Sequence, residues 1–341
     1  MNLTTNYHNI FYKLFKFKWR NPFITTSKIL FRGSTPKRVL GILDFENGRA
    51  VIGDTIAFHE ILLVIAEANK IDEIDIAFVN PRVRNYSKNI YQIMETHLIE
   101  DLISLNKVNP KLGSYYVFNN NSQFSKFFHS FRNMYIIFPN PIMPFSTVSN
   151  WHHVTEFYEK EHYIPELIID SESVEYGKKF IEEHCDGKIP VVAAIRKNNR
   201  DEARNAPVLE WIKFFQYAEK RHNEYKFIII GAKNEIIPEL EEMDNIVFAK
   251  SYGSTLLQDI ALITLCQLFI GNESGVVCYS WFTNKPTISF GMEKRHVHWG
   301  QAIRHNQKFN FLNGMQQVYW GKYTTDDVIS SFENITKNLK L

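Results

Sequence analysis

Two short polar segments combine residue types that bind phosphate and sugar hydroxyl groups. The first, here called the polar turn, is residues 272–276 (Asn-Glu-Ser-Gly-Val), which follow the apolar run 268–270. Where a strand ends in such a turn and a helix opens, outward backbone N–H groups and the helix dipole favour a diphosphate. Ser274 adds a hydroxyl donor, Gly275 permits close approach, and Glu273 can accept from ribose or sugar hydroxyls. The alternative is an ordinary helix start, with Ser274 as N-cap and Gly275 as a packing glycine.

The second segment, here called the basic loop, is residues 195–207 between a predicted buried strand and a helix that Pro207 begins well. Its four cations are Arg196, Lys197, Arg200 and Arg204. Such a loop can neutralise a diphosphate and stabilise the charge that develops on a leaving nucleotide. A solvated surface loop is the alternative.

A carboxylate stands at the start of the first predicted helix, where Asp54 follows Gly53. From there Asp54 would face the second half of the molecule across a cleft. A carboxylate within hydrogen-bond reach can take the proton from an attacking hydroxyl group. Helix capping by Asp54 is the alternative, and it is chemically sufficient by itself.

Strands alternate with helices along most of the chain, and this alternation positions the three segments. The first series has strands at 39–43, 74–79, 115–118 and 134–138 and helices at 54–69 and 91–105. The second series has strands at 190–195, 227–230, 246–248, 268–270 and 287–290 and helices at 173–184, 207–222, 256–265 and 275–283. The alternation predicts an α/β fold with parallel sheets covered by helices. Loops after parallel strands share one edge of the sheet, which is the ligand edge.

The pattern divides the chain into four parts. We expect a basic aromatic N-terminal segment at 1–37, an N-terminal domain at 38–165, a C-terminal domain at 166–320 and a C-terminal helix at 321–341. A hinge is expected at 162–165, and Thr324 or Thr325 is expected to cap the last helix.

Composition excludes several classes of protein. The 341 residues carry 39 basic and 37 acidic side chains, a net charge of +2, so no overall field selects a nucleic acid. The three cysteines never form a CxxC pair, which argues against a disulfide framework and a zinc site and fits a reducing cytoplasm. The histidines lack carboxylate or cysteine neighbours at ligand spacing, so no metal and no cofactor are expected.

The first 41 residues contain eight Lys or Arg and no Asp or Glu, interleaved with aromatic residues. Apolar residues at helical spacing between Tyr7 and Phe15 predict a short amphipathic helix. Two interpretations are open: the helix lies in the headgroup region of an anionic membrane, or it packs on the body of the protein. No apolar run is long enough to span a bilayer, and no secretion signal is recognised.

Separated motifs resemble the ADP-heptosyltransferase family of GT-B enzymes, which build the inner core of lipopolysaccharide. The matching residues are Gly53-Asp54; Arg204, Pro207 and Trp211; the strand, glycine and glutamate of 227–235, including Gly231 and Glu235; Glu273-Ser274-Gly275; Lys285-Pro286; and Gly291. Order and spacing agree over roughly residues 39–340, strongly in the second half and weakly in the first. The resemblance implies a GT-B fold, in which two Rossmann-like domains have parallel sheets that face a central cleft.

The resemblance also implies roles for individual residues. Asp54 would be the catalytic base and Gly53 its neighbour on the acceptor side. The donor-binding residues would be Arg196, Arg204, Gly231, Glu273, Ser274, Gly275 and Val276. The implied reaction inverts the anomeric carbon and needs no metal. Three departures bear on the donor: the long N-terminal segment, Cys278 where the family often has His, and arginines spaced as in GDP-fucose-using GT-B enzymes.

The sequence therefore predicts a glycosyltransferase of cell-surface polysaccharide biosynthesis, cytoplasmic and peripheral on the inner face of the membrane. Its partners would be a nucleotide sugar, a saccharide or glycolipid acceptor and, through residues 1–37, an anionic membrane surface, with no nucleic acid. One alternative is a GDP-fucose-type or other GT-B transferase. A second is a nucleotide-sugar epimerase, which would turn over donor alone. Another is a catalytically silent GT-B protein, which would bind nucleotide weakly and tolerate Asp54→Asn.

Overall fold

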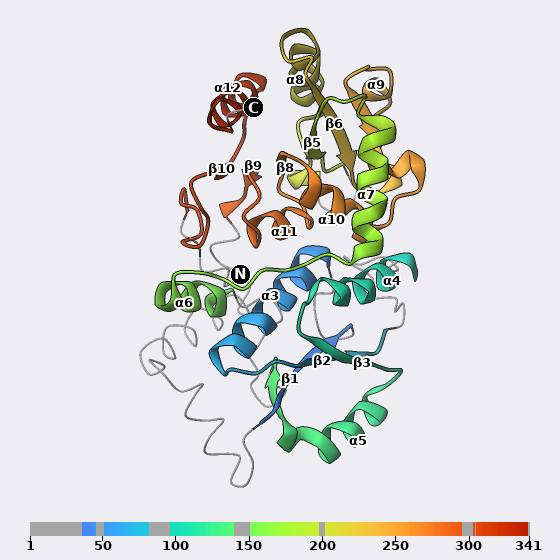
Figure 1. Cartoon of the computed structure of the whole chain (residues 1–341), viewed down its shortest axis with the longest axis vertical. Helices are drawn as coiled ribbons and strands as arrows, with labels where there is room; N and C mark the ends of the chain where they lie inside the picture. Colours follow the sequence, from blue (N-terminus) through green and yellow to red (C-terminus); the bar gives the residue numbers. More distant parts are fainter. Residues whose placement is uncertain are drawn as a thin grey trace, which may run out of the picture.

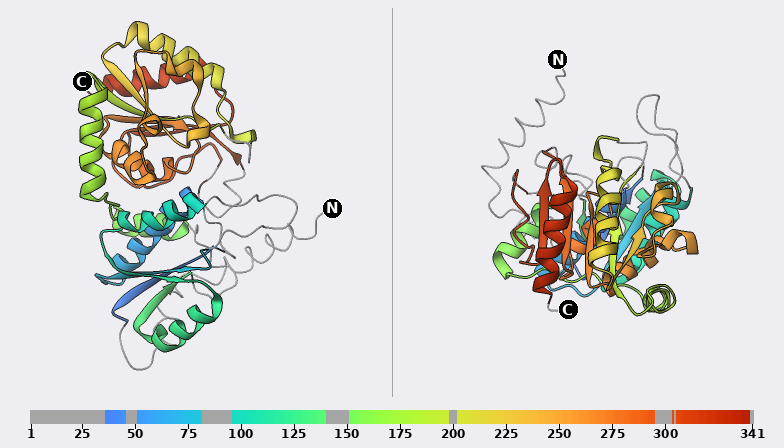
Figure 2. Two further views of the ribbon diagram at one scale, coloured as in Figure 1. Left: turned by 90° about the vertical axis from the view of Figure 1, so that its right-hand side faces the viewer. Right: turned by 90° about the horizontal axis from the view of Figure 1, so that it is seen from above.

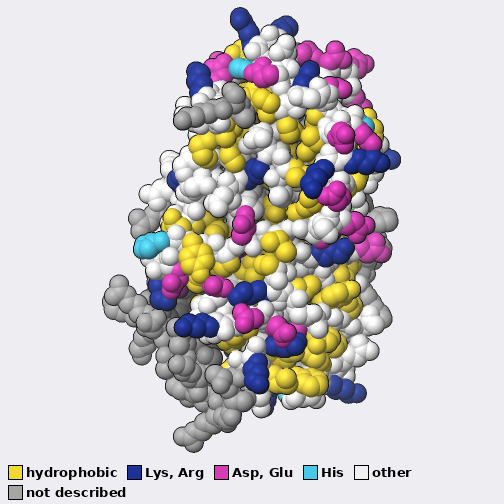
Figure 3. Space-filling model, in the orientation of Figure 1, with side chains coloured by type: hydrophobic (Ala, Val, Ile, Leu, Met, Phe, Trp, Pro, Cys, Tyr) yellow, Lys and Arg dark blue, Asp and Glu magenta, His cyan; other side chains and the backbone are white. Residues whose placement is uncertain are grey.

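The computed structural model describes residues 36–45, 51–81, 96–139, 151–197, 202–294, 303 and 305–339. These residues form two lobes stacked along the long axis of the molecule, each built around a parallel sheet (Figures 1 and 2). The predicted α/β fold with two parallel sheets is confirmed. On the face shown in Figure 3, basic and acidic side chains are interspersed over both lobes, in keeping with the small net charge.

The N-terminal lobe has a four-stranded sheet in the order β3-β2-β1-β4, and all its pairs are parallel. Its strands are β1 (Arg38–Asp44), β2 (Ile74–Val79), β3 (Leu112–Phe118) and β4 (Tyr135–Phe138). Its helices are α3 (Ile52–Ala68), α4 (Thr96–Ser104), α5 (Asn121–Phe131) and α6 (His152–Glu161). Alternate residues along a strand point to opposite faces, so the sheet has one core against α3 and a smaller one against α5.

The C-terminal lobe has a six-stranded sheet in the order β10-β9-β8-β5-β6-β7, again parallel throughout. Its strands are β5 (Ile189–Ala194), β6 (Tyr225–Ile230), β7 (Ile246–Phe248), β8 (Leu268–Asn272), β9 (Thr287–Met292) and β10 (Gln316–Trp320). Its helices are α7 (Ser171–His184), α8 (Val208–Arg221), α9 (Pro238–Glu241), α10 (Leu256–Leu265), α11 (Val277–Trp281) and α12 (Thr325–Asn338).

The strand order of this sheet reverses between β5 and β8. From β5 the chain proceeds outward through β6 and β7, and from β8 it proceeds outward in the other direction through β9 and β10. In open parallel sheets, ligands bind outside the carboxyl ends of the strands at such a reversal. The basic loop follows β5 and the polar turn follows β8, so both lie at this point.

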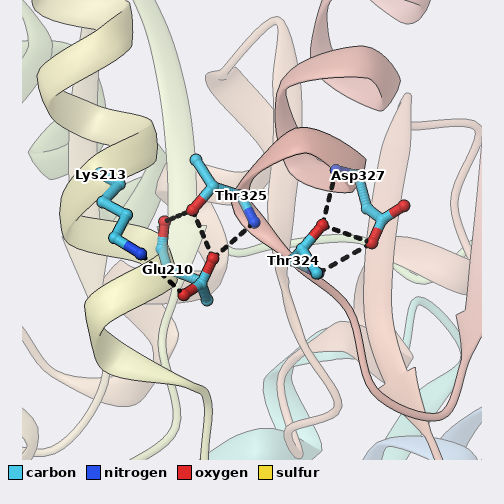
Figure 4. Close-up of polar contacts among 5 residues, drawn as sticks. All are labelled: Glu210, Lys213, Thr324, Thr325 and Asp327. Atoms are coloured by element: carbon cyan, nitrogen blue, oxygen red, sulfur yellow. Dashed lines mark hydrogen bonds and ion pairs between the residues drawn. The ribbon is translucent and has the colours of Figure 1, made fainter.

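Helix α12 closes one face of the C-terminal lobe, and its start is fixed by polar contacts (Figure 4). Thr324 is the N-cap, as expected, and its backbone N–H and hydroxyl both donate to Asp327 at 2.8 Å. Glu210 of α8 accepts from the backbone N–H of Thr325 at 2.8 Å and from its hydroxyl at 2.6 Å. The two helices on this face are therefore joined at their N-terminal ends.

The two lobes share one apolar core. Trp151 is 1% exposed and stacks on Phe309, with ring centroids 4.8 Å apart and planes at 20°. It also contacts Phe282 at 4.9 Å and Trp281 at 6.0 Å. Helix α3 lies between the sheet of the N-terminal lobe and α11 of the C-terminal lobe (Figure 1). The lobes are thus packed against each other along α3 and α6.

Several elements differ from the sequence-based expectation. Helices α5 and α6 and strand β10 were not expected, and α4 lies within the helix expected at 91–105. Residues 91–95 and the N-terminal segment before residue 36 lie outside the described residues. No helix among those described is both long enough and apolar enough to cross a bilayer.

Candidate active site

The basic loop and the polar turn leave the sheet from adjacent strands. Strands β5 and β8 pair in parallel, with Ala194 opposite Gly271. A Cβ atom on Gly271 would lie only 2.5 Å from the carbonyl oxygen of Ala194, so only glycine fits this position without displacing the strand. This close approach brings Arg196, the second residue after β5, within reach of the last side chain of β8.

That side chain, Asn272, joins both ends of the basic loop. Its Oδ1 accepts from the backbone N–H of Arg196 at 2.6 Å, and its Nδ2 donates to the carbonyl oxygen of Arg204 at 3.0 Å. The backbone N–H of Ala206 in turn donates to the carbonyl oxygen of Arg196 at 2.9 Å. Asn272 is 2% exposed, so its amide is satisfied by protein groups rather than by water.

Glu273, the next residue, is an ion-pair partner of Arg204. The side chain of Glu273 is 6% exposed and that of Arg204 is 20% exposed, and Oε1 accepts from a guanidinium nitrogen. A buried carboxylate needs such a partner to remain charged. In this structure Glu273 therefore pairs with Arg204. The expectation that Glu273 accepts hydrogen bonds from ribose or sugar hydroxyls stays a prediction.

The expected helix start at the polar turn is wrong. Helix α11 begins at Val277 rather than Gly275 and has five residues, and its N-cap is Val276, whose side chain makes no cap hydrogen bond. Ser274 is therefore not the N-cap. Its hydroxyl is inaccessible to solvent and has no hydrogen-bond partner among the described residues. A helix of little more than one turn has too small a dipole to attract a diphosphate by itself.

The polar turn instead packs against the start of α3 in the other lobe. A Cβ atom on Gly275 would lie 2.8 Å from Cβ of Ile52 and 3.0 Å from the backbone nitrogen of Gly53. A Cβ atom on Gly53 would lie 3.1 Å from Sγ of Cys278 and 3.3 Å from Cα of Gly275. Two glycines, one from each lobe, thus allow the two backbones to touch.

This contact brings Asp54 beside the polar turn. Asp54 is partly exposed in the first turn of α3, and the N-cap of that helix is Val51, so the alternative that Asp54 caps the helix is wrong. Burial raises the pKa of the Cys278 thiol, and the negative charges of Asp54 and Glu273 raise it further, whereas Arg204 lowers it. Asp54, Glu273 and Arg204 thus come from three separate segments, and the charge of each acts on the same buried thiol.

Gly231 lies farther along the same edge, at the end of β6. Its φ of 142° favours glycine, and a Cβ atom there would lie 2.9 Å from Oε2 of Glu235. The Glu235 carboxylate accepts from the backbone N–H of Ala232 at 3.1 Å and from that of Lys197 at 3.3 Å. Glu235 was not among the predicted site residues, although its spacing from Gly231 was the available signal.

The structure thus brings most of the predicted site residues together. Arg204, Glu273, Gly275, Gly53 and Asp54 form one group at the boundary between the lobes. Arg196 joins the group through Asn272, and Gly231 joins its edge through Glu235 and Lys197. Arg200 lies outside the described residues. Across the ranges that the structure describes, no three His, Cys, Asp or Glu side chains cluster closely enough to hold a metal ion.

Comparison with known proteins identifies the architecture. No protein-family model matches the chain, and no curated protein sequence matches it. Among solved structures, a glycosyl transferase family 9 protein from Veillonella parvula has a TM-score of 0.60 at 14% identity, covering 89% of this chain and 99% of its own. ADP-heptose lipopolysaccharide heptosyltransferase II from Escherichia coli has a TM-score of 0.58 at 12% identity, covering 89% and 100%.

A third structure, Escherichia coli heptosyltransferase WaaC with ADP, has a TM-score of 0.51 at 11% identity and covers 89% of this chain and 99% of its own. At such low identity, the likeness establishes the fold alone. The resemblance inferred from the sequence motifs is confirmed at that level. The chain has the GT-B fold, with two parallel-sheet lobes, that these glycosyltransferases share.

Proposed function

We propose that the protein is a glycosyltransferase that moves a sugar from a nucleotide-diphosphate sugar to a saccharide or glycolipid acceptor in cell-surface polysaccharide biosynthesis. One observation carries the proposal: the start of α3, which holds Asp54, contacts the polar turn of the other lobe at the point where the strand order reverses. Glu273 of that turn pairs with Arg204. The fold likeness to lipopolysaccharide heptosyltransferase II and to WaaC with ADP supports the proposal, and the likeness to heptosyltransferase II favours a lipopolysaccharide acceptor.

The proposed roles follow from charge and position. Arg204 and Arg196 bind the diphosphate of the donor and stabilise the negative charge that develops on the leaving nucleotide. Asp54 accepts the proton of the acceptor hydroxyl as that oxygen attacks the anomeric carbon, which inverts it. No metal takes part in the proposed step. The polar turn, including Ser274 and Val276, lines the donor side, and Gly53 lies on the acceptor side.

The two lobes and the N-terminal segment are proposed to have different roles. Residues 38–165 would bind the acceptor and residues 166–320 the donor, and residues 321–341 would form the C-terminal helix. The protein would act in the cytoplasm. Its basic aromatic segment, residues 1–37, would hold it against an anionic membrane that carries the acceptor.

A nucleotide screen tests the donor half of the proposal. The melting temperature is measured with ADP, GDP, UDP and CMP, because a ligand that binds only the folded state raises it. A nucleoside diphosphate is expected to give the largest rise. The donor sugar is then offered with and without a lipopolysaccharide acceptor. Turnover of donor without acceptor would favour an epimerase, and no response to any nucleotide would favour a silent binding protein.

The Asp54→Asn variant tests the chemical step. The amide cannot accept the proton, so transfer is expected to fall by about 10²- to 10⁴-fold while donor affinity stays near that of the wild type. Initial rates and donor affinity by calorimetry are the measurements. Asp72→Asn is the control, since the Asp72 side chain is 99% exposed on the same lobe. Wild-type transfer by the Asp54→Asn variant would remove Asp54 from the mechanism.

A further inference from the structure

We propose that Asn272 is a positioning residue that holds the basic loop ready for the donor diphosphate, with Glu273 orienting the guanidinium of Arg204. The inference deepens the proposed function and rests on it for the identity of the ligand. Asn272 contacts no reacting atom in this scheme. Its action is exerted through Arg196 and Arg204.

The hydrogen bonds of Asn272 join two separate positions of the basic loop. Arg196 and Arg204 are eight positions apart in the sequence, and the same amide group binds the backbone of both. The bonds have opposite polarity, because Oδ1 accepts from Arg196 and Nδ2 donates to Arg204. An amide side chain supplies an acceptor and a donor side by side in one plane at neutral pH. The residue type is thus fitted to joining the two ends of the loop.

The side chain of Asn272 is buried in the sheet. Asn272 is 2% exposed, so water cannot replace either bond when one is lost. It is also the last residue of β8, which pairs with β5 and β9 in the middle of the sheet. The loop is therefore attached to a central strand of the sheet rather than to another loop.

The ion pair of Glu273 and Arg204 fixes the charged end of Arg204 as well. Glu273 is the next residue along the chain, and its buried carboxylate holds the guanidinium of Arg204. One dipeptide thus fixes the backbone of Arg204 through an amide and its side chain through an ion pair. A diphosphate that binds Arg204 meets a cation already oriented, which removes part of the ordering cost of binding.

The first experiment needs no ligand. Amide hydrogen exchange is measured in the full chain for the backbone N–H groups of Arg196 and Ala206. In Asn272→Ala, exchange at both is expected to quicken by at least about 10-fold, since an N–H without a stable acceptor opens more often. Asn245→Ala is the matched control, because Asn245 is 1% exposed in the same lobe and its amide donates to Phe215, away from the loop. Unchanged exchange in Asn272→Ala would overturn the inference.

The second experiment measures binding, with ADP, GDP and UDP titrated separately by calorimetry. Asn272→Asp keeps the shape and the acceptor but loses the donor to Arg204, and adds a negative charge beside Glu273. Its affinity for the nucleoside diphosphate that binds the wild type best is expected to fall about 10- to 100-fold at pH 8. The reason is that the proposed contacts of Arg196 and Arg204 with the diphosphate, both charge-assisted, are disturbed. Asn245→Asp is the control and is expected to bind as the wild type does.

A pH series separates positioning from simple destabilisation. Once the new carboxyl group of Asn272→Asp is protonated, it can again donate to Arg204, so affinity relative to the wild type is expected to recover at low pH. Suppose that the affinity of Asn272→Asp does not recover at low pH and that its melting temperature has fallen as much as that of Asn245→Asp. That result would overturn the positioning role. If the wild type binds none of the three nucleotides, the proposed function fails, and the exchange experiment alone decides whether Asn272 holds the loop.

Discussion

At the level of single residues, the candidate site is defined by a small number of charged side chains, and two of them, Glu273 and Arg204, have little exposure to solvent. Glu273 and Arg204 neutralise each other, and Asp54 reaches the same neighbourhood from the opposite lobe. These three residue types could be singled out from the sequence, because each stands where a predicted strand ends or a predicted helix begins.

The role of Asn272 could not be predicted in the same way. Asn272 acts through its contacts with Arg196 and Arg204, 76 and 68 positions earlier, and those contacts require β5 and β8 to be neighbours. Strand order is a property of the assembled sheet. A local pattern of residues therefore does not reveal it.

Two buried titratable residues in α3 lead to a prediction about stability. Glu60 and His59 are fully buried and have no side-chain hydrogen-bond partner in the part of the chain that the structure describes. Burial raises the pKa of Glu60 well above 4.5 and lowers that of His59 from 6.5 to about 3. Above pH 4.5, the unfolded chain releases the Glu60 proton that the native state keeps, so stability falls as pH rises.

Glu60→Gln is accordingly expected to raise the free energy of unfolding, by an amount that grows by up to about 1.4 kcal/mol per pH unit between pH 5 and the raised pKa. His59→Gln is the opposite case. In the unfolded wild type His59 gains a proton below pH 6.5, whereas in the native state it does not until about pH 3. The gain in free energy of unfolding from the substitution therefore grows as pH falls. Urea denaturation at pH 5, 6.5 and 8 measures both. Equal gains at all three pH values would contradict the assignment.

At the level of elements, the contact between the polar turn and α3 differs most from the sequence-based expectation. The apolar residues 276–282 predict a helix that starts at Gly275. In the structure, Gly275 lies against Ile52 and Gly53 of the other lobe, so the turn keeps a conformation set by that contact and α11 starts only at Val277. A contact between lobes overrides local propensity, and a single sequence does not specify it.

Gly275→Ala tests this contact. The added methyl group would press on Ile52 and on the backbone of Gly53 at 2.8 and 3.0 Å, so α3 and the turn must separate. Because Asp54 follows Gly53, kcat is expected to fall at least about 10-fold, while nucleotide affinity changes less. Steady-state kinetics and calorimetry separate the two effects. Gly314→Ala is the control, since no heavy atom lies within 4 Å of its added Cβ; an equal loss of affinity and kcat in Gly275→Ala would contradict the expectation.

At the level of the whole molecule, the two α/β series could be recognised from the sequence because strand and helix periodicities are local. The aromatic core between the lobes could not. Trp151, Phe282 and Phe309 come from distant parts of the chain and meet only after both lobes have formed. Helices α5 and α6 were not expected either: α5 has no residue buried in full, and α6 has only a short apolar face of Val154 and Phe157.

The shared core predicts that the lobes unfold together. Trp151→Ala is expected to lower the free energy of unfolding by about 3–5 kcal/mol and to weaken the coupling between lobes. Calorimetry should give one transition for the wild type and a broadened or divided transition for the variant. Leu209→Ala is the control, because Leu209 is 71% exposed. Two separate transitions in the wild type would show that the lobes are independent.

The placement of α12 has a consequence for synthesis of the protein. Phe332 of α12 lies 5.5 Å from Phe214 and 5.8 Å from Phe227, ring centroid to ring centroid, in the middle of the core formed with α8. A ribosome makes residues 325–338 long after β5, β6 and α8, so these elements emerge before α12 is available to complete that face of the sheet. The C-terminal lobe must therefore complete its folding after most of it has been translated, and chaperones have their longest access to it during that interval.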